Sequence, residues 1–341
     1  MIEDFLRRDL MRSKSSRTLT SNEENSRRHN NHGKGCKPSN CGQDPEMQFG
    51  VCVPNYGETC SLDAIQQVAA AAEEAGYDSV WCTDHVLLPK NSNTPYERIL
   101  DSISTLAYLS AKTRRVRLGI SSLITPMRNP AVVAKQLATI DFLSNGRVML
   151  ATSAGWNEAE FQHLGSNFHN RGKRLDASIR LIRTLWTGKT DFDSKILPQK
   201  FHDAVFQPSP IQKHLTIWIG GSSSAAMRRA AKLGDGWHPN VEPLDEFSNL
   251  VKNFRASFPD AKDKQICARI GVNVKAEKSE YVSARGQKRI ILSSDMQQNR
   301  TILTSLESLG VSYLVLVPSI DGKATAHDQI ESMTKIGQKF L

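Results

Sequence analysis

From residue 47 onward, short apolar runs alternate with helical patterns, and this alternation restricts the fold more than any other feature of the sequence. Eight of the runs have the length and the β-branched or aromatic content of strands. Strands separated by helices pair in parallel, because a parallel crossover needs a dozen or more residues. The eight expected strands lie at 49–53, 79–82, 116–124, 147–154, 215–220, 236–238, 267–275 and 311–317.

The stretches between these runs carry helix signals. The stretch 62–76 places Ile65, Val68 and Ala72 on one face and ends at a glycine, which predicts an amphipathic helix. Asn129 followed by Pro130 is typical of a helix start, because asparagine caps free amides and proline tolerates the first turn. Further helices are expected at about 101–113, 130–143, 170–187 and 223–233.

Eight strand–helix units between residues 47 and 341 predict an α/β chain folded as a (β/α)8 TIM barrel, which takes ~250 residues before insertions. A doubly wound open sheet is the alternative. It would usually show a glycine-rich fingerprint after the first strand, and Pro54-Asn55-Tyr56-Gly57 is not one. The segments 188–214 and 276–300 show no clear strand or helix signal. We expect them to be insertion loops over the C-terminal face of the barrel.

The first 46 residues differ in composition from the rest. Residues 13–46 contain Leu19 as their one large aliphatic side chain, too little apolar surface to offset the entropy of ordering. We therefore expect a disordered tail at 1–46 and one domain at 47–341. The tail also contains two histidines and two cysteines, His29, His32, Cys36 and Cys41. Their spacing fits no common zinc pattern, and we expect no metal site.

Charge and composition narrow the class of partner. The net charge of +9 is spread along the chain, with no basic stripe interleaved with aromatic residues, so nucleic-acid binding is not expected. No apolar run reaches the ~18 residues of a membrane span, and the N-terminus lacks a signal-peptide pattern. Six cysteines in 341 residues indicate a reducing interior rather than a disulfide scaffold. We expect a cytoplasmic protein that acts on a small molecule.

Functional residues of a barrel lie at the C-terminal ends of its strands. Asp84 and His85 follow the second strand, and an imidazole there can exchange a proton near neutral pH. A buried histidine bonded to a carbonyl is the plainer reading. The other strand ends carry Ser121, Ser122, Gly155, Trp156 and His238.

The fifth strand ends in the turn Gly220-Gly221-Ser222-Ser223 before a helix. Free amides and the helix dipole favour a phosphate at such a place, although a plain helix cap would look the same. The sequence lacks the HExxH, CxxC, GxSxG and P-loop motifs. Metal, dithiol, triad and nucleotidase chemistries therefore have no motif to support them.

Four phrases carry a resemblance to a known family. They are AAAAEEAGYDSVWCTDHVLLP, RVRLGISSLITPMRNPAVVAKQLATIDFLSNGRVMLATSAGWNEAEFQHLG, RGKRLDASIRLIRTLW and IWIGGSSSAAMRRAAKLGDGWHP. They resemble the luciferase-like monooxygenase superfamily, and within it the coenzyme F420-dependent oxidoreductases. The resemblance implies a (β/α)8 barrel, usually a homodimer, with a flavin or deazaflavin at the C-terminal ends of the strands.

The resemblance also implies residue roles. It places Asp84 and His85 at the deazaflavin ring as catalytic residues, and it implies a bulge with a non-proline cis peptide at Ser121-Ser122. The cofactor, with its phosphate tail toward the glycines, is expected to contact Ser121, Ser122, Gly155, Trp156, Gly220, Gly221, Ser222, Ser223 and His238.

One position departs from the family pattern. Sugar-phosphate dehydrogenases of this family carry a catalytic glutamate where Trp156 stands, which argues against a sugar phosphate as substrate. Glu158 could replace that glutamate, but at a helix start it is rather expected to interact with the helix dipole.

Three functions stay open at this stage. The first is hydride transfer between reduced F420 and a small organic substrate. The second is an FMN-dependent monooxygenase that uses reduced flavin with O2 as co-substrate, and the third is a non-catalytic flavin-binding barrel. The substrate itself is expected to be selected by the loops 86–100, 188–214 and 276–300.

Overall fold

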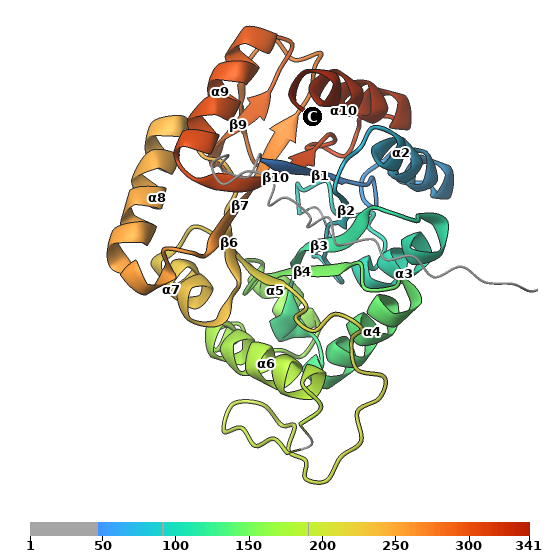
Figure 1. Ribbon diagram of the computed structural model, residues 1–341, viewed down its shortest axis with the longest axis vertical. Coiled ribbons are helices and arrows are strands. Elements are labelled where there is room, and N and C mark those ends of the chain that lie inside the picture. Colours follow the sequence, from blue (N-terminus) through green and yellow to red (C-terminus); the bar gives the residue numbers. More distant parts are fainter. Residues whose placement is uncertain (1–46, 91, 190) are drawn as a thin grey trace, which may run out of the picture. The chain divides into compact units, whose positions relative to one another are not determined.

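The structure, a computed structural model, describes residues 47–90, 92–189 and 191–341. The expected disordered tail and its possible zinc ligands lie outside the described residues. Eight parallel strands form a closed barrel, which confirms the predicted fold (Figure 1). Its strands are β1 (Gln48–Cys52), β2 (Ser79–Cys82), β3 (Arg117–Leu123), β4 (Val148–Thr152), β5 (Ile217–Gly220), β6 (Gly236–His238), β7 (Gln265–Val272) and β10 (Val311–Val317).

The barrel closes because β10 pairs in parallel with both β7 and β1. The helices lie around the strands (Figure 1), and α10 packs against α2. None of the helices in the described part of the chain is long and apolar enough to cross a membrane. They are α2 (Leu62–Glu74), α3 (Ser102–Lys112), α4 (Pro130–Leu143), α5 (Glu158–His163), α6 (Arg171–Trp186), α7 (Ser224–Leu233), α8 (Leu244–Ser257), α9 (Met296–Ser308) and α10 (Ala326–Phe340).

Aromatic side chains fill the inside of the barrel. The rings of Trp81 and Trp218 stack with centroids 5.3 Å apart, and Tyr313 meets Trp218 edge-on at 4.9 Å. Glycine in the neighbouring strand makes room for them, since a Cβ on Gly119 would lie 2.1 Å from the Trp81 ring. The barrel is therefore a packed core below its mouth, and ligands have access at the strand ends.

The segment 276–300 differs from its predicted irregular structure. It contains an antiparallel hairpin of β8 (Glu280–Val282) and β9 (Lys288–Leu292), followed by the start of α9. β9 also pairs in parallel with the end of β7 at Gly271, so the hairpin raises one wall of the C-terminal mouth. The run KRIIL is too short to be predicted as a strand from its sequence alone. Its strand conformation depends on pairing with the end of β7.

The segment 188–214 lies at the other end of the barrel from the mouth. It joins the end of α6 to the start of β5, and such connections lie at the N-terminal face. The buried carboxylate of Asp141 on α4 accepts hydrogen bonds from the amides of Ile211 and Gln212 at 2.8 and 3.1 Å. This corrects the expectation that 188–214 covers the C-terminal face and selects the substrate, whereas 86–100 and the hairpin do lie there.

Candidate active site

The end of β2 and the short helix α5 bring together a histidine and a buried glutamate. His85 Nδ1 lies 2.8 Å from Glu160 Oε2, and both side chains are buried. The second carboxylate oxygen of Glu160 accepts the backbone amides of Val86 at 2.6 Å and Leu87 at 3.3 Å. One carboxylate therefore fixes both the imidazole ring and the loop that carries it.

The protonation of this pair follows from its contacts. Burial raises the pKa of Glu160, but the hydrogen bonds from His85 and from the two amides outweigh it and lower the pKa below the usual value. A carboxylate only accepts, so His85 Nδ1 carries a hydrogen and donates it. The other ring nitrogen, Nε2, has no hydrogen-bond partner among the described residues. It is the atom of this pair that a ligand can meet.

Aromatic rings enclose His85 on two sides. Tyr96 stacks on the imidazole with centroids 4.8 Å apart, and Trp156 meets it edge-on at 5.7 Å. The guanidinium of Arg285, from the hairpin turn, lies 5.7 Å from the Trp156 ring. Trp156 thus lies against the His85 ring. The sequence analysis expected Trp156 to contact the cofactor.

Asp84 points into a different network from its neighbour. Its carboxylate accepts the hydroxyl of Ser102 at 2.7 Å, the amide of Ile124 at 2.9 Å and the guanidinium of Arg128 at 2.6 Å. These partners come from α3 and from the segment that follows β3. In the structure, Asp84 links the end of β2 to α3 and to the segment after β3 through hydrogen bonds. The sequence predicted a shared catalytic role with His85.

The end of β3 has the expected irregular geometry. The Ser121-Ser122 peptide bond is cis, and the register of β3 against β4 shifts between Ile120 and Leu123. The predicted bulge with a non-proline cis peptide is therefore confirmed. A Cβ on Gly220 would lie 2.6 Å from Ser122 Oγ. A larger residue at the end of β5 would therefore displace the Ser122 hydroxyl.

His238 supports this bulge from inside the barrel. Its Nε2 lies 2.7 Å from Ser121 Oγ, and its Nδ1 bonds the carbonyl of Cys267. Burial lowers the pKa of His238 to about 4, so the ring is neutral at physiological pH. A carbonyl only accepts, hence Nδ1 donates and Nε2 accepts from the serine hydroxyl. His238 is 3% exposed and acts through Ser121, although the sequence predicted a cofactor contact.

The turn after β5 combines a glycine of positive φ with a capped helix. Gly221 has a φ of +113°, a conformation that side chains rarely adopt. Ser223 Oγ accepts the amide of Ala226 and caps α7. Ser222 Oγ donates to Glu242, whose carboxylate pairs with Arg289 at 2.7 Å. Of the predicted phosphate contacts, the two serine hydroxyls and the Gly221 amide have protein partners, since that amide donates to the His238 carbonyl at 3.3 Å. The amides of Ser222, Ser223 and Ser224 have no partner among the described residues.

Gly155 also has left-handed backbone, with a φ of +79°. A Cβ there would lie 2.7 Å from Ile124 and 2.8 Å from Phe161. The glycine therefore allows the loop after β4 to pack closely against these two side chains. Glu158, the other residue considered in this loop, lies in the first turn of α5 and 3.5 Å from His169 on the surface.

The sequence reasoning missed two residues of this site, Glu160 and Arg269. The pattern of Asn157 followed three residues later by Glu160 reads as a helix cap, and Asn157 does accept the Glu160 amide. The glutamate side chain instead reaches the loop after β2, a contact across 75 residues. Arg269 lies within a strand that reads as buried, and its side chain extends into the mouth.

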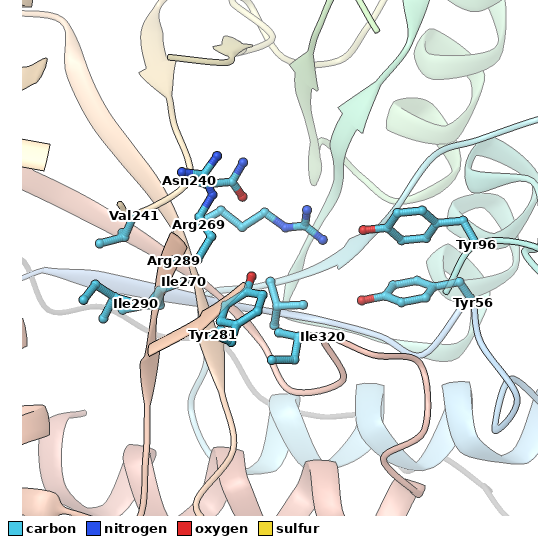
Figure 2. Close-up of a pocket in the computed structure, with 12 residues that line it drawn as sticks. Tyr56, Tyr96, Asn240, Val241, Arg269, Ile270, Tyr281, Arg289, Ile290 and Ile320 are labelled. Carbon is cyan, nitrogen blue, oxygen red and sulfur yellow. The ribbon is translucent and has the colours of Figure 1, made fainter. Parts of the chain in front are cut away.

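A pocket opens at the mouth of the barrel, on the wall formed by β7, β10 and the segments that follow β1 and β6 (Figure 2). Figure 2 shows the guanidinium of Arg269 pointing toward the hydroxyls of Tyr56 and Tyr96. Tyr56 and Tyr96 meet edge-on at 5.0 Å, so the pocket continues to the ring that stacks on His85. Its lining includes Tyr56, Tyr96, Asn240, Arg269, Tyr281 and Ile320.

Known proteins resemble this chain in sequence and in fold. The sequence model of the family described as luciferase-like monooxygenase matches residues 47–312. An F420-dependent glucose-6-phosphate dehydrogenase of Amycolatopsis mediterranei is 34% identical over 182 residues, 50% of this chain and 51% of that protein. An FMNH2-dependent dimethylsulfone monooxygenase of Pseudomonas putida is 27% identical over 235 residues, 67% of this chain and 62% of that protein. The chain thus spans about half of one relative and under two thirds of the other.

Among solved structures, an F420-dependent secondary alcohol dehydrogenase in complex with an F420-acetone adduct superposes with a TM-score of 0.69. The two share 15% sequence identity over 85% of this chain and 98% of the other. At that identity the likeness shows the fold alone.

Proposed function

The chain belongs to the luciferase-like monooxygenase family, a family of flavin- or F420-dependent oxidoreductases and monooxygenases, and we propose that it transfers a hydride between reduced F420 and a small organic substrate. The observation that carries the proposal is the buried Glu160–His85 pair, with His85 Nε2 free at the mouth of the barrel. The choice of F420 over FMN rests on the higher identity to an F420-dependent relative, 34% against 27%.

The backbone around the ends of β3 and β5 fits a flat cofactor with a phosphate tail. Gly220 and Gly221 present main chain without a Cβ, and the cis peptide at Ser121-Ser122 shapes the neighbouring strand end. The first amides of α7 have no helical acceptor, as at any helix start, and favour an anion. We assign the ring to the Ser121-Ser122 bulge and the phosphate to the turn at 220–223. Bound there, the reduced cofactor supplies the hydride.

The residues of the chain provide the proton. A substrate carbon that accepts a hydride leaves negative charge on an adjacent atom, and a protonated His85 Nε2 can neutralise it. Glu160 orients the ring by accepting the hydrogen of Nδ1, and the carboxylate stays ionised in the pair. Trp156 and Tyr96 cover the imidazole and keep water from it. In the reverse direction the neutral Nε2 accepts the proton.

Titration of the purified full chain with F420 and with FMN tests this assignment. We expect F420 to quench the intrinsic fluorescence at lower concentration than FMN. Ser224→Pro should weaken the binding of whichever cofactor is preferred, because it removes an amide at the start of α7. Preference for FMN, with consumption of O2 once the flavin is reduced, would replace the proposal by the monooxygenase function. Binding of neither cofactor would favour a barrel that has lost the family's activity.

A further inference from the structure

The strongest unexplained feature is the side chain of Arg269 in the pocket at the mouth of the barrel. Its Nη2 donates to Thr83 Oγ1 at 3.1 Å, and its Nε is buried without a hydrogen-bond partner among the described residues. No carboxylate of the described residues lies within 4 Å of this guanidinium. A buried donor without a partner is costly, and a charged group in that state favours an anionic ligand.

The second arginine of the pocket, Arg289, has a carboxylate partner. Arg289 is buried and pairs with Glu242 at 2.7 Å, and it also donates to Gln287 at 2.7 Å. Its charge is therefore neutralised within the protein. The pocket keeps one uncompensated positive charge, which suits a group with one negative charge, because a second negative charge would be buried without a partner.

The remaining lining combines aromatic surface with hydroxyl donors. The rings of Tyr56, Tyr96 and Tyr281 surround the Arg269 guanidinium, and Ile320 adds apolar surface (Figure 2). Tyr56 donates its hydroxyl to the Ser319 carbonyl at 2.6 Å. Burial raises the pKa of Tyr281 despite the nearby arginine, so its hydroxyl stays protonated and can donate. These groups suit a small ligand with an apolar body and an acidic end.

The pocket and the assigned cofactor contacts lie on different strand ends of the same mouth. In the closed order of eight strands, β7 lies four strands from β3, directly across the barrel. The cofactor contacts assigned above lie along β3 and β5, while the pocket lies along β7, β10 and the segments that follow β1 and β6. Tyr96 belongs to the pocket and stacks on His85. A ligand held by Arg269 therefore faces the assigned cofactor wall across the mouth, next to the ring that stacks on His85.

We propose that Arg269 binds the carboxylate of a small organic monoacid, which is the substrate class of this site. The guanidinium edge at Nε and Nη2 is a fork that matches the two oxygens of a carboxylate. The body of the acid packs against the touching rings of Tyr56 and Tyr96 and against Ile320, with its far end toward His85 Nε2. The proposal rests on the proposed function for the role of substrate, but the binding of the acid can be measured without the cofactor.

The test is calorimetric titration of the cofactor-free full chain with benzoate, with benzamide as the neutral molecule of the same shape. We expect benzoate to bind at least tenfold more tightly than benzamide. Arg269→Met should abolish that preference, and Arg269→Lys should retain part of it, because a lysine keeps the charge but not the fork. Arg180→Met, which removes an exposed arginine from α6, should leave both affinities unchanged.

Other outcomes would overturn the proposal. It fails if the wild-type protein does not prefer benzoate over benzamide, or if Arg269→Met keeps the preference. If inorganic phosphate displaces benzoate and binds with higher affinity than benzoate does, the arginine is a phosphate site instead. A parallel F420 titration separates this inference from the proposed function. Arg269→Met should bind F420 like the wild type, and a loss of F420 affinity equal to the loss of benzoate affinity would make the arginine a cofactor ligand.

Discussion

Two polar side chains at the N-terminal end of the barrel have several hydrogen-bond partners each, whereas two side-chain nitrogens at its mouth have none in the part of the chain that the structure describes. At the N-terminal end, the Arg147 side chain donates five hydrogen bonds, and the Asp141 carboxylate accepts from three backbone amides and from the Gln212 side chain. At the mouth, His85 Nε2 and Arg269 Nε have no partner among the described residues. The same kinds of group thus stabilise the fold where they are satisfied and are available to ligands where they are not.

The largest effect should come from His85. We expect His85→Asn to lower turnover by ~10²–10⁴, the usual size of a general acid–base contribution. The melting temperature should fall only modestly, because the asparagine amide can still donate a hydrogen to the Glu160 carboxylate. Steady-state kinetics and thermal denaturation of the same preparation measure both.

Asp84→Asn is the matched control for that variant. It should lower the melting temperature, because Arg128 loses its buried partner, and it should retain most of the turnover. The opposite pattern, with activity lost and stability kept, would return Asp84 to the catalytic role that the sequence suggested.

The other end of the barrel should respond in stability alone. Asp141→Ala leaves several buried donors without an acceptor and should cost about 3 kcal/mol of unfolding free energy. Denaturant unfolding measures the loss, and turnover per folded molecule should equal that of the wild type. A proportional fall of activity would show that the two ends are not independent.

Glu160 is expected to position His85, and Glu160→Gln tests that role. The amide should lower turnover by ~10²-fold and shift the pH profile, because it no longer favours a proton on Nδ1. A variant that lowers the rate without moving the profile would indicate a purely structural contact.

The same variant predicts a pH dependence of stability. The pKa of Glu160 is lower in the folded protein than in the unfolded chain. Its ionised form therefore stabilises the fold at pH values above the unfolded pKa of ~4.3. The stabilisation is lost as the pH falls through the lower folded pKa. The melting temperature of the wild type should exceed that of Glu160→Gln at neutral pH, and the difference should disappear under acidic conditions.

The smallest effect is expected at the start of α7. Ser224→Pro removes one amide donor at a position where proline is tolerated, and the preceding Ser223 has the extended ψ of 154° that proline requires. Cofactor affinity should fall roughly tenfold, as for one hydrogen bond to a charged group. Leu62→Pro at the start of α2, also after an extended residue, is the control and should leave the affinity unchanged.

The sequence was sufficient to predict the eight strands of the barrel and most of the residues at their C-terminal ends. Local signals such as Asn129-Pro130 or the glycines at 220 and 221 mark boundaries that depend on few neighbours, and the structure has them in place. The direction of the side chains was not predictable in the same way. Asp84 and His85 are adjacent, but one points to Arg128 and the other to Glu160.

Residues that meet only through barrel closure escaped the sequence reasoning. Arg269 faces Tyr56 and Tyr96 because β7 returns through β10 to β1. No local pattern encodes that meeting. The hairpin at 280–292 was missed for a similar reason, since β9 is held by the end of β7.

Closure of the barrel also bears on self-association. A strand with unpaired backbone groups invites another chain to add to the sheet and so promotes aggregation. In the described part of the chain, each of the eight barrel strands has neighbours on both sides, and the sheet ends at β8. β8 has three residues and begins with a glutamate, so it offers another strand little to pair with. Concentrated solutions of the folded protein should therefore resist growth of β-rich aggregates.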